Sequence, residues 1–405
     1  MKKNNTLFFF TIGFPCSEGE PFIKNEYPYL LDNFDKIIII TSIKGGNVNI
    51  YKNTTVYFLE DILFQKSKFK YLTCNLYNII KILCSEYKHC NSKLYFLKNL
   101  RQYNSLLINA FICANFIENL KEFDKNAYYY SYWMNNHAIT LSILKLKNKI
   151  NRFIFRVHGY DLILERWPHN FIAFQNTCHK YADEIHTVSK KSLEYLKKTY
   201  KNNLKAKVNY LACIDNGINP SKPTNDSFLT LVSCSNIIPL KRLHLIIEAL
   251  KHVQKKVRWI HFGDGILRDD IICRSKQLPS HIHLTLKGQV SQNELFDFYN
   301  NNHIDFFINV SDSEGLPFTI IEATSFGIPI IATNVGGTSE IVKDETGILL
   351  DINFNTSDIS SILNNFDKSP FSTNKFRYGV KEFWGNNFFA GNTYPHFIKT
   401  ALLQK

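Results

Sequence analysis

Two glutamates, Glu314 and Glu322, stand eight residues apart, and carboxylates are strong hydrogen-bond acceptors. An apolar, β-favouring run over 304–310 stops at a polar turn that contains Glu314. Pro317 then begins a helical pattern that includes Glu322, because proline suits a first helical position, where no N–H partner is needed. The sequence therefore predicts one carboxylate on a loop at a strand end and a second one in the helix that follows.

A second strand–loop–helix unit comes directly after the first. An apolar run over 328–332 leads to Gly336 and Gly337, and another helical pattern follows. Repeats of this kind are typical of a parallel sheet that binds ligands at the carboxyl ends of its strands. Glycines at strand ends occur in any α/β protein, and a helical glutamate is usually solvated. Glu314 is harder to explain in that way, because the glycine beside it allows close backbone approach.

The residues from Glu314 onward resemble the E-x7-E segment of glycosyltransferase family 4, whose members are GT-B enzymes with nucleotide-sugar donors. The similarity includes E-G-x-P from Glu314, the strand G-x-P-[IV]-[IV]-A-[ST] from Gly327 and G-G-x-x-E-[IL]-[IV] from Gly336. The resemblance implies that Glu314 holds hydroxyl groups of the donor sugar and that Glu322 holds the ribose.

A donor of this kind needs a place for its diphosphate, because breaking the sugar–phosphate bond builds negative charge there. In the family, Gly-Arg at a strand end and a later Lys-Gly supply the cations. Here Lys241 matches the lysine, Asn236 stands near the expected arginine, and Arg242 replaces the glycine. Whether Arg242 supplies the second positive charge or the site uses one cation stays open. An ordinary solvated lysine is the alternative for Lys241, but the helix dipole disfavours cations near a helix start.

Two further loops are expected at the donor site. Gly263 and Gly265 follow a strand as the G-x-G of the family, which is a weak pattern alone. Gly315, Leu316 and Pro317 stand at a helix start, where free N–H groups and the helix dipole favour anions.

Candidate residues of the acceptor side lie in the N-terminal half. His158 and Asp161 end a strand in a pattern similar to the family's H-G-x-D, which implies a histidine near the transferred sugar. A structural histidine is the alternative. Gly13 and Gly19 bound a loop in the place of the family's first glycine-rich loop, which faces the phosphates and the acceptor. Tyr132 and Trp133 end another strand, and they contact either the acceptor or the core.

Length and composition indicate a folded protein of two domains. The 405 residues exceed what one core comfortably supports, and 45% hydrophobic with 20% charged residues fits a folded soluble protein. No stretch reaches the roughly 18 uncharged apolar residues of a membrane span. The run over 7–15 is interpreted as the first strand rather than a signal peptide, since it is short and lacks a small-residue cleavage site.

The cysteines and acidic residues do not suggest a metal centre. Nine cysteines are scattered without any C-x-x-C, so reduced thiols in a cytoplasmic protein are expected. No D-x-D occurs, so a metal-bridged diphosphate is not expected. The prediction is a metal-independent protein with no cofactor besides its donor substrate.

The net charge of +13 is compatible with nucleic acid, an anionic membrane or phosphorylated ligands, and equally with compositional drift. The region 62–125 is expected to be mainly helical, with lysines between aromatic residues. Core packing with lysine stems along the rim is the first interpretation of this region. Contact with a bilayer interface is the second, and single-stranded nucleic acid the third.

Together these patterns predict an α/β protein of GT-B architecture, with two Rossmann-like domains whose parallel sheets face each other across a cleft. The acceptor domain is expected over 1–220, the nucleotide-sugar domain over 221–383, and a helix that crosses back over 384–405. The turn-forming stretch 215–223 is the expected linker.

The expected activity is retaining, hexosyl-type sugar transfer from a nucleoside-diphosphate donor to a glycan or lipid-linked acceptor of capsule, lipopolysaccharide or exopolysaccharide. The resemblance implies a cytoplasmic enzyme at the inner face of the plasma membrane, without a nucleic-acid partner. Two alternatives stay open. A nucleotide-sugar epimerase of the same architecture would need paired acids and bases that the sequence does not show. A non-catalytic basic protein that binds membranes or RNA would have no reason to combine Glu314, Glu322 and Lys241.

Overall fold

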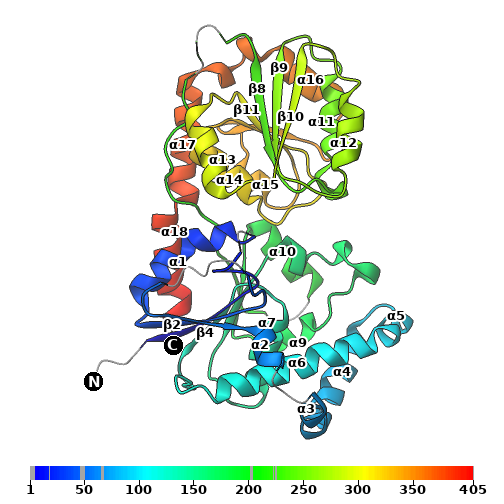
Figure 1. The fold of residues 1–405 in the computed structure, drawn as a ribbon, viewed down its shortest axis with the longest axis vertical. Coiled ribbons are helices and arrows are strands. Elements are labelled where there is room, and N and C mark those ends of the chain that lie inside the picture. Colours follow the sequence, from blue (N-terminus) through cyan, green and yellow to red (C-terminus); the bar gives the residue numbers. More distant parts are fainter. Residues whose placement is uncertain are drawn as a thin grey trace. The chain divides into compact units, whose positions relative to one another are not determined.

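The computed structural model describes residues 5–17, 19–45, 51–64, 68–200, 204–221, 223 and 226–404. Within the loops, helical region and linker discussed above, residues 18, 65–67 and 222 lie outside the described residues. The chain divides into two compact units, Met1–Asn209 together with Tyr394–Lys405, and Tyr210–Thr393 (Figure 1). Each unit is an α/β fold with its own sheet and its own core.

The N-terminal unit contains a seven-stranded sheet in the order β3-β2-β1-β4-β5-β6-β7, and every pairing is parallel. Its inner strands are apolar runs, as expected of parallel strands covered on both faces; Phe8, Phe9 and Phe10 of β1 are fully buried. The strands are β1 Thr6–Thr11, β2 Lys36–Thr41, β3 Thr54–Phe58, β4 Tyr128–Ser131, β5 Ile154–Val157, β6 Glu184–Thr187 and β7 Ala206–Val208.

Helices connect these strands, and the region 62–125 is mainly helical as predicted. Figure 1 shows α3, α4 and α5 grouped at one side of the N-terminal unit, beside the long α6. The helices of this unit are α1 Pro21–Asn33, α2 Leu59–Phe64, α3 Lys68–Cys74, α4 Leu76–His89, α5 Lys93–Lys98, α6 Leu100–Glu118, α7 Asn136–Leu146, α8 Gly159–Leu162, α9 Gln175–Tyr181 and α10 Lys190–Thr199; α18 Ala390–Phe397 ends in it.

The C-terminal unit contains a six-stranded parallel sheet in the order β10-β9-β8-β11-β12-β13. Its strands are β8 Leu229–Cys234, β9 Val257–Phe262, β10 Ile282–Gly288, β11 Phe306–Asn309, β12 Ile330–Thr333 and β13 Gly347–Leu350. Its helices are α11 Leu243–Leu250, α12 Arg268–Ser275, α13 Gln292–Asn301, α14 Phe318–Ser325, α15 Thr338–Ile341, α16 Thr356–Asn364 and α17 Asn374–Phe388. The predicted fold class, two Rossmann-like α/β units with parallel sheets, is confirmed.

The structure differs from the sequence analysis at sheet edges and helix starts. The edge strands β3, β7 and β13 were not predicted, since short strands with half-buried residues show neither a long apolar run nor alternation. Pro317 is the N-cap of α14 rather than its first residue. Lys241 belongs to a 3-10 turn, Pro239–Lys241, that precedes α11.

The two units also differ from the expected domains, whose boundaries were placed at residues 220 and 383. Cys213 explains the difference, because its N–H donates to Phe388 O at 3.2 Å and its carbonyl accepts from Ala390 N at 2.9 Å. Residues 210–220 and 384–393 therefore group with the C-terminal unit.

Candidate functional site

The loops after β8 and β11 meet at one edge of the C-terminal sheet, because these strands are neighbours and parallel. Lys241 comes from the loop after β8 and Glu314 from the loop after β11. Lys241 Nζ lies 2.6 Å from Glu314 Oε1, and the two side chains are 20% and 12% exposed. A hydrogen bond from Asp312 N to Leu240 O at 2.8 Å joins the two loops directly. The structure thus brings together two of the predicted residues as an ion pair.

Glu314 is held as a carboxylate. Burial acts to raise its pKa, but the charge and hydrogen bond of Lys241, together with hydrogen bonds from Ser311 and Asn309, hold the pKa of Glu314 below its ordinary value. Asn309 Nδ2 approaches Oε1 at 3.4 Å, and Asn309 Oδ1 accepts from Ser311 N at 3.0 Å. Asn309 ends β11, and the sequence analysis did not identify it, because an asparagine at a strand end has no distinctive pattern.

Arg242 has a different set of partners from Lys241. Its guanidinium donates to the carbonyls of Val310 at 2.8 Å, Ser311 at 3.2 Å and Ile352 at 3.0 Å. Its backbone has φ +49°, a left-handed conformation that favours glycine. The glycine expected at this position by resemblance is thus replaced by a residue that accepts the strained backbone and ties the end of β11 to the loop after β13.

Glu322 lies in α14 and is almost fully buried. Gln292 Nε2 donates to its Oε1 at 2.6 Å. Burial raises the pKa of Glu322 to about 7, with Gln292 opposing the rise. Cys234, at the carboxyl end of β8, lies close enough to both Glu322 and Lys241 to experience their charges. Glu322 is therefore near the same strand end as the ion pair. Gln292 was missed, because nothing in its own segment indicates a partner 30 residues away.

The glycines of this edge permit close backbone approach. A Cβ on Gly263, whose φ is +128°, would lie 1.9 Å from Ser235 O, and one on Gly265 would lie 2.5 Å from Ile237 O. A Cβ on Gly336, whose φ is +53°, would lie equally close to Glu314 O. These glycines therefore shape the loops that contain Asn236 and Glu314. The sequence showed the G-G pattern at Gly336, but it did not predict the close approach of Gly336 to the backbone of Glu314.

The remaining predicted donor residues occupy the same edge. Asn236 is exposed after β8. Gly315 accepts through its carbonyl from Gly337 N at 2.8 Å. Leu316 and Pro317 are buried at the start of α14.

The predicted acceptor residues lie at the carboxyl edge of the N-terminal sheet. Asp161 accepts from His158 N at 2.5 Å and from Met134 N at 2.8 Å, which joins the ends of β5 and β4. Burial raises the pKa of Asp161 to about 7 against these hydrogen bonds. Burial and the charge of Arg156 hold the pKa of His158 well below its usual range, so its imidazole is neutral.

Arg156 itself forms a buried ion pair that the sequence analysis did not identify. Its guanidinium lies 2.9 Å from Glu26 and donates to Tyr132 Oη at 2.7 Å. Both charged side chains are fully buried. An arginine inside an apolar strand was the available signal, but its partner in α1 could not be read from the sequence.

The loop after β1 is occupied by one of its own side chains. Gly13 N donates to Glu20 Oε2 at 2.6 Å, and Gly19 N donates to Ser17 Oγ at 3.1 Å. The binding of phosphate by Gly13 and Gly19 stays a prediction.

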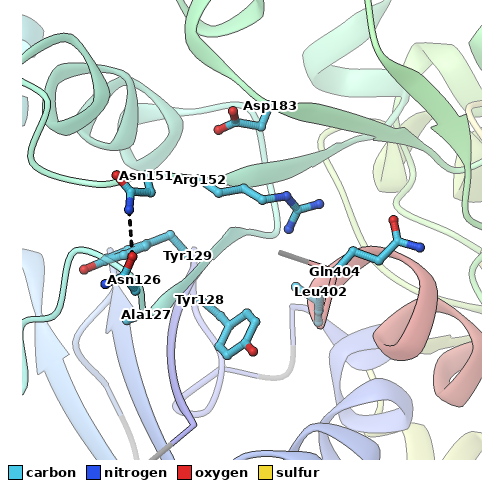
Figure 2. A pocket seen from close by; sticks show the side chains of 9 residues that line it. All are labelled: Asn126, Ala127, Tyr128, Tyr129, Asn151, Arg152, Asp183, Leu402 and Gln404. Atoms are coloured by element: carbon cyan, nitrogen blue, oxygen red, sulfur yellow. Dashed lines mark hydrogen bonds between the residues drawn. The ribbon is translucent and has the colours of Figure 1, made fainter. Parts of the chain in front are cut away.

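A pocket of about 470 Å³ lies at the opposite, amino edge of the N-terminal sheet (Figure 2). Asn126, Asn151, Arg152, Asp183 and Gln404 contribute to its lining. The sequence-predicted residues do not line this pocket.

The described residues contain no cluster of three or more His, Cys, Asp or Glu side chains that could hold a metal ion. Among the helices that the structure describes, none is long and apolar enough to cross a membrane.

Comparison with known proteins agrees with this arrangement. Residues 217–383 match the family model of glycosyl transferases group 1. An uncharacterized glycosyltransferase of Methanocaldococcus jannaschii is 27% identical over 318 residues, which cover 78% of this chain and 82% of that protein. The O-antigen biosynthesis glycosyltransferase WbnH of Escherichia coli is 40% identical over 125 residues, which cover 27% of this chain and 36% of WbnH.

Solved structures resemble the whole chain. The crystal structure of Anabaena HepE in complex with UDP and glucose has a TM-score of 0.66 at 14% identity, and the match covers 98% of this chain and 99% of that one. The fold is therefore that of the GT-B glycosyltransferases. The segment matched by the family model contains Lys241, Glu314 and Glu322.

Proposed function

We propose that this protein is a retaining, metal-independent glycosyltransferase of family 4 that moves a hexose from a nucleoside-diphosphate donor to a glycan or lipid-linked acceptor of a surface polysaccharide. The single observation that supports the proposal most is the Lys241–Glu314 pair at the carboxyl edge of β8 and β11, inside the matched segment. Relatives such as WbnH act in O-antigen biosynthesis, which supports a polysaccharide acceptor.

In this mechanism Lys241 stabilises the diphosphate as it departs. Cleavage of the anomeric C–O bond leaves its electron pair on the diphosphate, and a preorganised cation is most effective where that charge develops. Glu314 accepts hydrogen bonds from hydroxyl groups of the donor sugar, and Glu322 accepts from the ribose. The acceptor oxygen attacks the same face of the sugar, and its proton passes to the departing phosphate oxygen. Arg242 serves as a brace for the Glu314 loop, so the site uses one cation.

A thermal-shift screen tests the donor class. UDP-, GDP- and ADP-sugars are added to the full chain, and one of them is expected to raise the melting temperature in the presence of EDTA. The product of turnover should be a free nucleoside diphosphate and a glycoside with the donor's anomeric configuration, read by NMR. Release of an epimerised nucleotide sugar would instead identify an epimerase, and stabilisation by none of the sugars would contradict the proposal.

We further propose that the enzyme sits on an anionic membrane surface through α3, α4 and α5. Of the 15 large apolar side chains exposed among the described residues, eight lie between Phe64 and Leu100. Seven cations between Lys68 and Arg101 are exposed, and the only acid in that stretch, Glu86, is buried. Exposed apolar residues with a positive charge suit the interface of an anionic bilayer. The exposed set is Lys68, Phe69, Lys70, Leu76, Tyr77, Ile80, Lys81, Lys88, Lys93, Leu94, Leu97, Lys98, Leu100 and Arg101.

Sedimentation with vesicles tests this surface. The chain is expected to bind vesicles that contain anionic lipid, to bind neutral ones less, and to dissociate as salt rises, since each lysine near the surface contributes on the order of 1 kcal/mol. The double change Phe69→Ser and Tyr77→Ser should reduce binding. Ile266→Ser, at an exposed apolar residue of the C-terminal unit, is the matched control. Equal binding to both vesicle types would attribute the charge to compositional drift.

A further inference from the structure

In the loop after β1, three backbone N–H groups converge on the buried side chain of Glu20. The N–H groups of Gly13 and Phe14 donate to Glu20 Oε2 at 2.6 and 2.7 Å, and that of Ile12 donates to Oε1 at 3.3 Å. Successive N–H groups that converge in a turn are a general anion site. Glu20 is only 4% exposed. The anion that this loop can hold is therefore already supplied by the chain.

Glu20 also fixes the orientation of an aromatic side chain at the neighbouring strand end. Trp133 Nε1 donates to Glu20 Oε1 at 2.5 Å. On the other side of Trp133, Met134 N donates to Asp161. Two buried carboxylates thus hold the end of β4 from both sides. Trp133 remains half-buried, in contrast to Tyr132 before it and Met134 after it, which are buried.

The ring of Trp133 lies against His158, with ring centroids 4.0 Å apart. His158 is 7% exposed, and among the described residues neither of its ring nitrogens has a hydrogen-bond partner. A buried polar atom without a partner is costly and points to a missing ligand group. A neutral imidazole can donate from one nitrogen and accept at the other, as a hydroxyl group can.

We propose that Trp133, held in place by Glu20, contacts a neutral sugar ring of the acceptor, and that the loop after β1 binds no phosphate of either substrate. This inference rests on the proposed function and names the chemistry of its acceptor. A pyranose presents C–H groups on its faces and hydroxyl groups at its rim. The C–H faces can pack on the ring of Trp133, and the hydroxyl groups can form hydrogen bonds with His158. Trp133 is a contact residue, and Glu20 is a positioning residue that acts through it.

The first experiment compares matched ligands on the full chain. The probes are methyl glycosides of glucose, galactose, mannose and N-acetylglucosamine, each beside its sugar 1-phosphate, with saturation-transfer NMR as the readout. At least one methyl glycoside should bind the native chain, and its phosphate, measured with the donor site filled by a nucleoside diphosphate, should bind no more than about twofold tighter. Trp133→Ala should weaken the glycoside at least fivefold, while the nucleotide-sugar thermal shift stays unchanged. Absence of glycoside binding, unchanged binding in Trp133→Ala, or a phosphate at least tenfold tighter would overturn the inference.

The second experiment tests the role of Glu20. Glu20→Ala frees the N–H groups, so inorganic phosphate should stabilise this variant against heat more than it stabilises the native chain, in which phosphate can bind beside Lys241. Glu20→Gln keeps an acceptor for Trp133 and should retain glycoside binding within about threefold. Glu86→Gln is the matched control, because Glu86 is also a buried carboxylate that accepts from backbone N–H groups of the same unit, Phe174 and Thr177. It should change stability without changing glycoside binding.

The two proposals fail separately. If no nucleotide sugar raises the melting temperature of the native chain, the result counts against the proposed function. An intact nucleotide-sugar response combined with equal phosphate stabilisation of the native chain and Glu20→Ala counts against the inference alone.

Discussion

At the scale of single residues, Lys241 and Glu314 form an ion pair in a place where the proposed function adds a second anion. The donor diphosphate would share Lys241 with Glu314, so Lys241 has to stabilise both. Lys241→Ala should reduce kcat by about two to three orders of magnitude, the usual loss for one preorganised charge-stabilising group. Turnover of the best donor from the thermal-shift screen is the measurement. Circular dichroism should show a folded chain with a lowered melting temperature, because the mostly buried Glu314 loses its counter-charge.

A second substitution, Lys241→Arg, tests whether the positive charge accounts for the role of Lys241. Lys241→Arg keeps the charge and should recover part of the rate. A rate near that of the native chain in Lys241→Ala would mean that another cation holds the diphosphate.

Glu322 gives the donor site a pH dependence. Since the pKa of Glu322 is raised to about 7, the buried carboxyl takes up a proton as the pH falls below that value. An ionised carboxylate accepts ribose hydroxyls more strongly than a protonated one. Donor affinity should therefore fall as the pH is lowered from 8 to 6, as measured by calorimetric titration.

The same group also affects stability, in the opposite direction. A carboxyl whose pKa is raised on folding contributes stability that is present below its unfolded value and is lost as the pH rises through about 7. Glu322→Gln removes the titration, so it should flatten both pH profiles. A profile of donor affinity that is unchanged in Glu322→Gln would assign the titration to another group.

The residues predicted from sequence share one property, which is that their own segment identifies them. Glu314, Glu322 and Lys241 each follow a recognisable strand or turn, and the structure places them at one edge. Glu20, Gln292 and Asn309 have equally direct contacts, but their importance comes from partners on other elements. Glu20 meets Trp133 across 113 positions of the chain, which no local pattern encodes.

At the scale of elements, Arg242 connects the end of β11 with the loop after β13. Arg242→Gly removes three hydrogen bonds and also relieves a left-handed backbone, so the losses and gains partly offset each other. We expect a net loss of about 2 kcal/mol in the free energy of unfolding. The rate should fall by about tenfold, since the loop that carries Glu314 is less well fixed. Chemical denaturation and kcat are the two measurements.

The size of the rate loss distinguishes a brace from a second cation. Arg242→Lys retains the charge but cannot reach three carbonyls, so it should resemble Arg242→Gly. If Arg242 held the diphosphate, Arg242→Gly would lose as much rate as Lys241→Ala, and Arg242→Lys would be much less affected.

Central strands were easier to predict than edges. β11 and β12 are apolar runs bounded by turns, and the predicted runs 304–310 and 328–332 lie close to their observed bounds. β7 has only three residues, and β3 is half-buried throughout, so neither shows the continuous burial that marks a central strand.

At the scale of the whole molecule, the last residues of the chain complete the core of the first unit. Phe397 is 3% exposed and packs on Tyr130 and His186, with its ring 5.2 Å from the Arg156 guanidinium. Phe397→Ala should destabilise the N-terminal unit by about 3–5 kcal/mol. Hydrogen exchange should then accelerate in β4, β5 and β6.

Phe388 offers a matched comparison nine positions earlier. It is 2% exposed and packs on Tyr210 within the C-terminal unit. Phe388→Ala should therefore accelerate exchange in the C-terminal sheet and leave β4 to β6 unchanged. The same exchange pattern in both variants would contradict the assignment of these two segments to different units.

The discontinuous N-terminal unit reverses the usual order of events during protein synthesis. Domains of a nascent chain generally fold from the N-terminus onward as they leave the ribosome. Here the strands that surround Glu26 and Arg156 emerge first, yet Tyr394 and Phe397 cover that ion pair only after all of 210–393 has been translated. The C-terminal unit is contiguous in sequence and can therefore complete its folding first. Until then, Glu26 and Arg156 of the N-terminal unit stay exposed to water.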